Sequence, residues 1–354
     1  MAKNEKITIY DISKKLNISA ATVSRALNNN PKISVKTREL VMKTAKELNY
    51  KQNRLALALK SGKTNSIGVI VPYINRNFFS AVIYGIEKLL APHGYNVIIC
   101  QSHEDALNEA NHIAALLNTQ VDGIFMSVSK TTQDTSHIEM ILESKIPLIF
   151  FDRKKDIPGV SSVTIDDFRG GYMATEHLIQ QGARRVAHFS GDLNLEIYRN
   201  RHNGYLKALE DNDIPVDKGL IVHTNSRIEA GAEAVTKLWS KKGRPDAIFS
   251  SSDYAALGAI QELRKMDVDI PSDVGVVGFS NEPFTKYMEL PMSSVDQTPA
   301  AMGEIAAQVF LEQIDNEQHV LSVEKRVVLA PELIVRRSSD KKGSLIGKPP
   351  VSKE

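Results

Sequence analysis

The sequence of 354 residues contains a single cysteine, Cys100. One cysteine cannot form a disulfide within the chain, and disulfides are typical of secreted domains. No apolar run approaches the roughly 18 residues that a membrane-spanning helix needs. The charged N-terminus also lacks the apolar stretch of a secretory signal. We therefore expect a cytoplasmic protein without a membrane segment, and a buried, unreactive thiol at Cys100, which ends the apolar run 97–99.

Motifs of common enzyme classes are also missing. The chain has no GxxxxGK[ST] phosphate loop, no GxSxG nucleophile elbow and no HExxH zinc motif. Its nine histidines are scattered without the spacing of metal ligands. His188, near the end of an apolar segment, is better interpreted as a core residue than as a ligand. The sequence thus predicts a protein that is not an enzyme and needs no metal or other cofactor.

The charge of the chain is unevenly distributed. Hydrophobic residues make up 42% and charged residues 24%, as in ordinary globular proteins, and the length allows two or three domains. The first 63 residues carry 14 basic and 4 acidic side chains, whereas the remainder carries 30 basic and 38 acidic ones. A basic head on an acidic body is typical of a polyanion-binding domain joined to a second domain. A merely solvated basic face is the alternative, but the same segment also contains a helix-turn-helix pattern.

Three short helices are predicted in the head. Apolar residues recur at helical spacing over 9–16, and Asn17 tolerates the left-handed conformation of a sharp turn. Ser19 is a good N-cap for a second helix over 20–27, and Ser34 is a good N-cap for a third helix that follows it. The third helix is expected to complete a small core with four side chains: Leu40, Val41, Ala45 and Leu48.

The second helix carries the side chains that suit DNA. A helix fits the major groove, where the residues near its N-terminus reach base edges. Arg25 can bind the O6 and N7 atoms of guanine bidentately, whereas Ala20 and Ala21 offer only apolar contact, for instance to a thymine methyl group. Many helical hairpins share this spacing, so the pattern by itself leaves other roles open.

The segments 8–13 (TIYDIS), 18–28 (ISAATVSRALN) and 33–38 (ISVKTR) resemble the headpiece of the LacI/GalR family of bacterial repressors. The resemblance resumes at 67–72 and extends nearly to Arg336. It implies base contacts by Ala20, Ala21 and Arg25. It implies contacts to the DNA backbone by Thr8, Tyr10, Ser19, Thr22, Ser24, Asn28 and Thr37.

Residues 53–60 (NRLALALK) lie between the two predicted domains and are apolar and helix-prone. The pattern alone favours a linker helix packed on its neighbour. The resemblance implies instead a hinge helix that forms when paired with its twin on DNA, with Leu59 inserted in the minor groove and Ala56 beside it. A helix of eight residues is marginal in water, so the hinge is expected to switch between ordered and disordered states. Leu57 and Ala58 depart from the polar pair common in the family.

From residue 66 onward, apolar segments alternate with amphipathic ones, which predicts α/β architecture with doubly wound parallel sheets. The predicted strands are 67–71, 97–100, 123–126, 146–151, 185–189, 247–250 and 274–278. The resemblance extends to the periplasmic-sugar-binding-protein fold, in which two lobes enclose a ligand cleft and the chain crosses between them three times. We place these crossings near Asp166, Val295 and Arg326.

The expected organisation is therefore a headpiece (1–52), a hinge (53–65), a two-lobed effector-binding and dimerisation domain (66–339) and a disordered polar tail (340–354). The N-lobe would comprise 66–165 and 296–326, and the C-lobe 167–294 and 327–339. The tail lacks an apolar heptad, which argues against a tetramer-forming helix and leaves a homodimer.

Six side chains are candidates for binding the effector: Phe78, Phe79, Asp152, Arg201, Asp253 and Ser280. The resemblance places all of them except Asp152 at the cleft. All except Ser280 have a structural alternative: the phenylalanines suit a core, Asp253 suits a helix N-cap, Arg201 suits a helix surface, and Asp152 could be structural. An arginine in the cleft can bind a carboxylate or vicinal hydroxyls. Ser280 stands where many family members have an aspartate, so no particular sugar is implied.

The sequence thus predicts a DNA-binding transcriptional regulator, a repressor on the precedent of the family. It would bind a pseudo-palindromic operator as a homodimer, under the control of a small polar metabolite such as a sugar or sugar derivative. A free binding protein with the same body would need no basic head. A headpiece fused to an enzyme would turn its metabolite over. Whether the effector acts as inducer or corepressor does not follow from the residues.

Overall fold

The computed structural model describes residues 7–51, 63–315 and 324–343. The chain divides into two compact units, one up to Thr64 and one from Asn65 onward. We call them the head and the body. The predicted hinge residues Ala56 and Leu59 lie outside the described residues.

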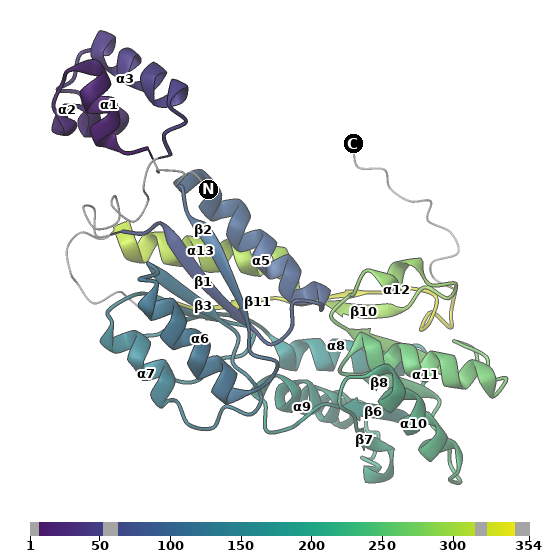
Figure 1. The fold of residues 1–354 in the computed structure, drawn as a ribbon. Helices are drawn as coiled ribbons and strands as arrows, with labels where there is room; N and C mark the ends of the chain where they lie inside the picture. Colours follow the sequence, from purple (N-terminus) through teal and green to yellow (C-terminus); the bar gives the residue numbers. More distant parts are fainter. Residues whose placement is uncertain (1–6, 52–62, 316–323, 344–354) are drawn as a thin grey trace, which may run out of the picture. The chain divides into compact units, whose positions relative to one another are not determined.

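The described part of the head contains α1 (Ile9–Leu16), α2 (Ala20–Leu27) and α3 (Val35–Glu47) around a small apolar core (Figure 1). The predicted signals delimit these helices. Asn17 ends α1 in the left-handed conformation, and the hydroxyl of Ser19 accepts a hydrogen bond from the N–H of Thr22. The prediction for the core was wrong at Leu40, which is 49% exposed, because Val41 and Ala45 occupy the inward face of α3.

In the described part of the body, two sheets of six strands are present, and each sheet defines one lobe (Figure 1). The N-lobe sheet is entirely parallel and has the order β11-β5-β4-β3-β1-β2. Its strands are β1 (Ser66–Val71), β2 (Asn96–Gln101), β3 (Gly123–Met126), β4 (Leu148–Phe151), β5 (Ser161–Ile165) and β11 (Arg326–Leu329). Its helices are α5 (Asn77–Leu90), η1 (Ala91–His93), α6 (Ala106–Asn118), α7 (Ser136–Glu143) and α13 (Pro299–Asp315).

The C-lobe sheet has the order β12-β10-β9-β8-β6-β7, and its edge strand β12 is antiparallel to β10. Its strands are β6 (Val186–Ser190), β7 (Ile221–His223), β8 (Ala247–Ser250), β9 (Gly275–Phe279), β10 (Ser293–Asp296) and β12 (Glu332–Ile334). Its helices are α8 (Asp167–Gln180), α9 (Glu196–Asp211), η2 (Lys218–Leu220), α10 (Ile228–Trp239), α11 (Asp253–Lys265) and α12 (Phe284–Tyr287).

Alternation along the strands produces a core on each face of the N-lobe sheet. Ile67 and Val69 of β1 pack with the cluster of α5 and α13, whereas Ile70 packs with the cluster of α6 and α7. Successive side chains of a strand point to opposite faces, so an apolar run such as that of β1 fits a sheet covered on both sides.

Helices α5 and α13 cross closely at Gly85 and Gly303 (Figure 1). A Cβ atom on Gly85 would overlap the carbonyl oxygen of Ala300, and one on Gly303 would overlap that of Val82. The obstructing atoms belong to the backbone, so this contact requires glycine at both positions.

Two boundaries differ from the sequence-based expectation. The third crossing lies between Leu329 and Glu332 and not near Arg326, because β11 pairs with β5 of the N-lobe. The chain also stays attached to the C-lobe at the start of the predicted tail. Lys341 Nζ donates to the carbonyl of Asp246 at 3.2 Å. The N–H of Lys342 donates to Oε1 of Gln181, the C-cap residue of α8, at 3.0 Å. Residues 344–354 lie outside the described residues.

Candidate functional site

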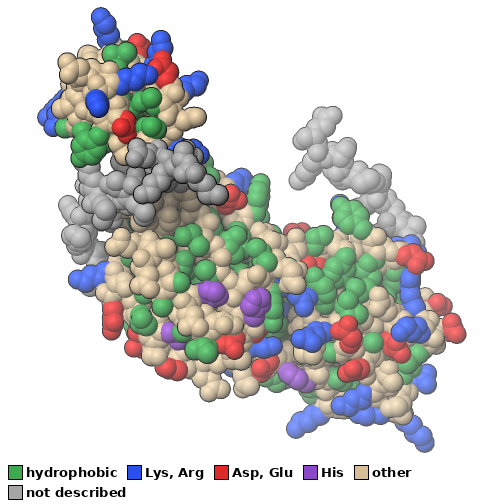
Figure 2. Space-filling view, viewed as in Figure 1, with side chains coloured by type: hydrophobic (Ala, Val, Ile, Leu, Met, Phe, Trp, Pro, Cys, Tyr) green, Lys and Arg blue, Asp and Glu red, His purple; other side chains and the backbone are tan. Residues whose placement is uncertain are grey.

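The exposed face of the head is basic. Figure 2 shows Lys and Arg side chains distributed over its visible surface. Arg25, on the last turn of α2, is exposed, as is Ala21, whereas Ala20 is half-buried. These three candidates for base contact lie on one short helix whose other face, Val23 and Ala26, is buried in the core.

The candidates for contact with the DNA backbone lie mainly at helix starts. Ser19 Oγ and Thr22 Oγ1 are 2.9 Å apart at the start of α2, and Thr37 Oγ1 is 2.8 Å from Ser34 Oγ at the start of α3. Thr8 begins α1, and the ring of Tyr10 is exposed. Ser24 and Asn28 lie at the other end of α2, where the Asn28 amide donates to the Ser24 carbonyl. Helix N-termini of this kind suit phosphate oxygens.

A cavity of about 390 Å³ lies between the two lobes of the body. Its walls come from the segments that follow the strands at their carboxyl ends, which is where parallel sheets bind ligands. All six effector candidates line it: Phe78, Phe79, Asp152, Arg201, Asp253 and Ser280. A cavity of this size holds one small molecule.

Arg201 of α9 is not a surface arginine, because only 3% of it is exposed. Its Nε donates to Asp167 Oδ1 at 2.7 Å and its Nη1 to the carbonyl of Ser251 at 3.0 Å. Its Nη2 donates to Gln297 Oε1 at 3.3 Å, and Cζ lies 3.7 Å from the ring centre of Phe279. Asp167 follows the first crossing and Gln297 follows β10 at the second, so Arg201 connects both crossings to the wall of the cleft.

Ser280 extends this chain of contacts. Its hydroxyl accepts a hydrogen bond from Gln297 Nε2 at 2.9 Å, and its backbone has a φ of 114°. Gln297 therefore bridges Ser280 and Arg201. At this position the cleft presents a short neutral side chain whose hydroxyl already has a protein partner.

Asp253 has both oxygens occupied by the protein. It is fully buried, and it accepts hydrogen bonds from the N–H of Glu282 at 2.8 Å and from Ser294 Oγ at 2.6 Å. Burial raises the pKa of Asp253 to about 7, although both hydrogen bonds oppose the shift. The alternative role as N-cap was wrong, because Ser252 occupies the N-cap position of α11.

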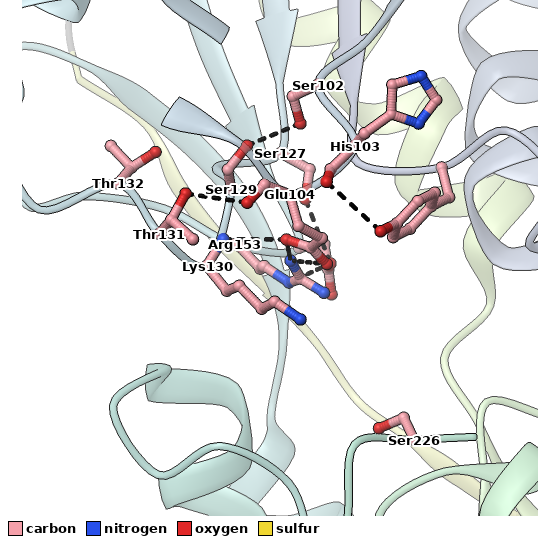
Figure 3. A network of polar contacts seen from close by, with 12 residues as sticks. Ser102, His103, Glu104, Ser127, Ser129, Lys130, Thr131, Thr132, Arg153 and Ser226 are labelled. Carbon is pink, nitrogen blue, oxygen red and sulfur yellow. Dashed lines mark hydrogen bonds and ion pairs between the residues drawn. The ribbon is translucent and has the colours of Figure 1, made fainter. Parts of the chain in front are cut away.

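Asp152 contacts Ser127 and Arg153, two members of a polar cluster of the N-lobe that Figure 3 shows from close by. Arg153 Nη1 donates to both oxygens of Glu104, at 2.9 and 2.8 Å, and Asp152 accepts from Ser127 Oγ at 3.3 Å. Burial raises the pKa of Asp152, while the nearby Arg153 and Arg201 lower it. In the same view Ser226 of the C-lobe lies across from this cluster (Figure 3).

Phe78 and Phe79 combine the two roles considered for them. Their rings meet edge to face at 5.2 Å, and both line the cavity while belonging to the buried cluster of α5 and α13. Further aromatic rings of the cavity wall come from Tyr198 and Tyr254 of the C-lobe. Aromatic faces beside hydrogen-bonding groups suit a ligand with both apolar and polar surfaces.

Most of the lining residues were not foreseen from the sequence, among them Arg76, Glu104, Arg153, Tyr254 and Glu282. Each of these five lies just beyond the carboxyl end of a strand or at the start of the next helix. Their position in the sequence, directly after a predicted strand, could therefore have identified them as cleft residues. Within residues 7–51, 63–315 and 324–343, no group of three or more His, Cys, Asp or Glu side chains is arranged to hold a metal ion. The same residues include no helix long and apolar enough to cross a membrane.

The fold and the site define a class of protein, in which a helix-turn-helix head accompanies a two-lobed ligand-binding body. Residues 8–53 match the model of bacterial regulatory proteins of the lacI family. Residues 64–330 match the model of periplasmic binding proteins and the sugar-binding domain of the LacI family. The chain belongs to the LacI family, and it is a DNA-binding transcriptional regulator with an effector-binding domain.

Similar proteins extend over nearly the whole chain. The HTH-type transcriptional regulator DegA of Bacillus subtilis (strain 168) is 33% identical over 94% of this chain and 98% of its own length. A structure of the transcriptional regulator CelR in complex with cellobiose is 28% identical, with a TM-score of 0.71 over 94% of this chain and 99% of that chain. The lac repressor dimer bound to operator and the anti-inducer ONPF shares the fold, with a TM-score of 0.84, 22% identity and coverage of 95% and 99%.

Proposed function

We propose that this protein is a cytoplasmic, homodimeric repressor whose affinity for a pseudo-palindromic operator is set by a sugar or sugar derivative bound between the lobes. The observation that carries the proposal is the position of Arg201. Its guanidinium lines the cleft and contacts Asp167 and Gln297, one beside each of two crossings. A ligand that rearranges these contacts changes the angle between the lobes.

The chemistry of the cleft supports a hydroxyl-rich ligand. Its cationic groups include two arginines already paired with carboxylates, Arg153 with Glu104 and Arg201 with Asp167. Ser280 adds a neutral hydroxyl. Hydroxyl groups can share these donors and acceptors, and the aromatic rings offer faces for the C–H surface of a sugar. The structure of the transcriptional regulator CelR, to which this chain is 28% identical, contains such a ligand, cellobiose.

On the head, we propose that Arg25 binds a guanine and that Ala20 and Ala21 provide apolar contact to neighbouring bases. The hydroxyl groups at the helix starts and the basic side chains would contact phosphates, so operator affinity is expected to fall steeply with salt. The proposed insertion of Leu59 in the minor groove and the position of Ala56 beside it rest on the family resemblance. The protein would act without catalysis.

The test combines two measurements on the full-length protein. A selection from random duplexes identifies the operator, and a thermal-shift screen of mono- and disaccharides identifies ligands, since a ligand that binds the folded state raises its melting temperature. We expect one of the sugars to change operator affinity by about 5–150-fold. Arg201→Lys, which keeps the charge but loses the planar fork, should abolish this response. A head without sequence preference, or chemical turnover of the sugar, would overturn the proposal.

A further inference from the structure

The wall of the cleft contains a corner directly after β9, formed by Ser280 and Asn281. Both residues have a positive φ, 114° at Ser280 and 50° at Asn281. Residues other than glycine rarely adopt such angles, and they do so where the surrounding contacts fix the backbone. Ser280 lines the cavity, and its hydroxyl accepts a hydrogen bond from Gln297 Nε2. The conformation of this corner therefore sets where the cleft presents the Ser280 hydroxyl.

Asn281 is held through both its backbone and its side chain. Its N–H donates to Ser294 Oγ at 2.9 Å, and its Nδ2 donates to Asp296 Oδ2 at 2.8 Å. Its Oδ1 accepts from the hydroxyl of Thr285 at 3.3 Å. Ser294 and Asp296 belong to β10, the strand that leads into the second crossing. One end of the Asn281 amide thus joins the corner to the start of that crossing.

Arg336 binds the other end of the Asn281 amide from a distant part of the chain. It lies two residues after β12, the strand that follows the third crossing. Its Nη2 donates to Asn281 Oδ1 at 2.8 Å. Its Nη1 donates to Thr285 Oγ1 at 3.1 Å and to the carbonyl of Met292 at 2.8 Å. Because a guanidinium is a rigid planar fork, this one side chain fixes three acceptors relative to one another.

The segment that carries Arg336 is itself anchored in the C-lobe. The N–H of Arg336 donates to Ser293 Oγ at 2.7 Å, and its carbonyl accepts from the same hydroxyl at 2.9 Å. Two residues further on, Ser338 is fully buried. Its hydroxyl accepts from the N–H of Ser293 at 2.9 Å and donates to the carbonyl of Val276 at 2.6 Å. The guanidinium is therefore held from an ordered backbone, so its contact with the corner costs less conformational entropy.

We propose that Arg336 is a positioning residue of the effector cleft, which holds Asn281 in the left-handed conformation and thereby fixes the Ser280 hydroxyl in the cleft wall. The inference deepens the function proposed above and rests on it, because the corner belongs to the same cleft. Arg336 is absent from the described residues that line the cavity, so it acts through Asn281. Since Arg336 follows the third crossing and Asp296 leads into the second, a change in the angle between the lobes moves both supports of the corner.

The test measures amide hydrogen exchange by mass spectrometry on the full-length protein without any effector. The N–H groups of residues 280–282 all donate to protein acceptors, so they report on the corner. Arg336→Met keeps a similar side-chain length but removes the guanidinium donors, and exchange in the peptide that contains 280–282 should become about tenfold faster. The matched control is Arg337→Met, at the next residue, which is exposed. The control should leave this exchange unchanged.

Glycine at position 281 separates positioning from general stabilisation. Glycine adopts a positive φ at little cost, so the corner of Asn281→Gly should no longer depend on Arg336. Adding Arg336→Met to Asn281→Gly should change exchange at 280–282 by less than about twofold, whereas the same substitution in the wild-type background changes it about tenfold. A residue that only stabilises the C-lobe would speed exchange equally in both backgrounds. Asn281→Ala loses the same hydrogen bonds but keeps a Cβ atom, so it should exchange faster than Asn281→Gly.

Unchanged exchange at 280–282 in a folded Arg336 variant would overturn the inference, as would an equal increase in the wild-type and Asn281→Gly backgrounds. An Asn281→Ala variant that exchanges no faster than Asn281→Gly would also overturn it, because the corner would then need no support. Arg336→Lys keeps the charge without the fork, and it replaces Arg336→Met if circular dichroism shows that the methionine variant is unfolded. No effector enters these measurements, so failure of this positioning role is distinguishable from failure of the proposed effector response.

Discussion

Replacing Arg201 by methionine should destabilise the body strongly, because the substitution leaves a buried carboxylate without its cation. The side chains of Arg201 and Asp167 are each only 4% exposed, and their N–O distance is 2.7 Å. Methionine has a similar length and keeps the apolar contact with Phe279, so most of the loss comes from Asp167. Removing one partner of a buried pair costs about 3–5 kcal/mol.

The assay is urea unfolding followed by the fluorescence of Trp239, which lies on α10 of the C-lobe and is the only tryptophan of the chain. We expect the unfolding free energy to fall by about 3–5 kcal/mol in Arg201→Met. In Arg201→Met with Asp167→Asn, the buried group is neutral, and about half of that loss should be recovered. Arg199→Met, on the same helix but exposed, should change stability by less than about 0.5 kcal/mol.

Two outcomes would refute this interpretation of Arg201. A loss below about 1 kcal/mol in the single variant would mean that water or a rearranged side chain compensates Asp167. A double variant as unstable as the sum of the two single variants would mean that the residues act independently. In either case Arg201 would not connect the crossings, and its role in the cleft would be limited to ligand contact.

Three other substitutions test separate parts of the molecule. Arg25→Ala should lower the preference for one base pair per half-site by about 1–3 kcal/mol in gel shifts, whereas equal losses on all duplexes would indicate a phosphate contact. Gly85→Ala should cost about 1–3 kcal/mol in urea unfolding, because its Cβ meets the carbonyl of Ala300. Burial raises the pKa of Asp253 from 3.8 to about 7, so the folded state retains its proton longer than the unfolded state and stability falls as pH rises across that interval. Asp253→Asn should reduce this fall by about 2–4 kcal/mol, measured by unfolding at a series of pH values.

The parts of the fold that were predictable depend on local signals. Ser19 and Asn17 delimit their helices by contacts within four or five residues, and the apolar run of β1 is recognisable without knowing its neighbours. Strands such as β5 (SSVTI) and β10 (SSVD) are polar and short, and their extended conformation comes from pairing with distant strands. The third crossing was misplaced for this reason, since only the pairing of β11 with β5 assigns Arg326 to the N-lobe.

The candidate site was predictable in position but not in connectivity. Residues after strand ends were expected in the cleft, and Ser280, directly after β9, lines it, as does Arg201 of α9. The partners of Arg201 come from three segments far apart in the sequence, so no spacing could identify them.

The contacts of the cleft suggest why the serine at position 280 is compatible with a responsive site. Ser280 is bonded to Gln297, Gln297 to Arg201, and Arg201 to Asp167, so a ligand hydroxyl that replaces one of these bonds affects the next. An aspartate at 280 would add a charge beside the buried carboxylates already present, which would raise the cost of closing the lobes.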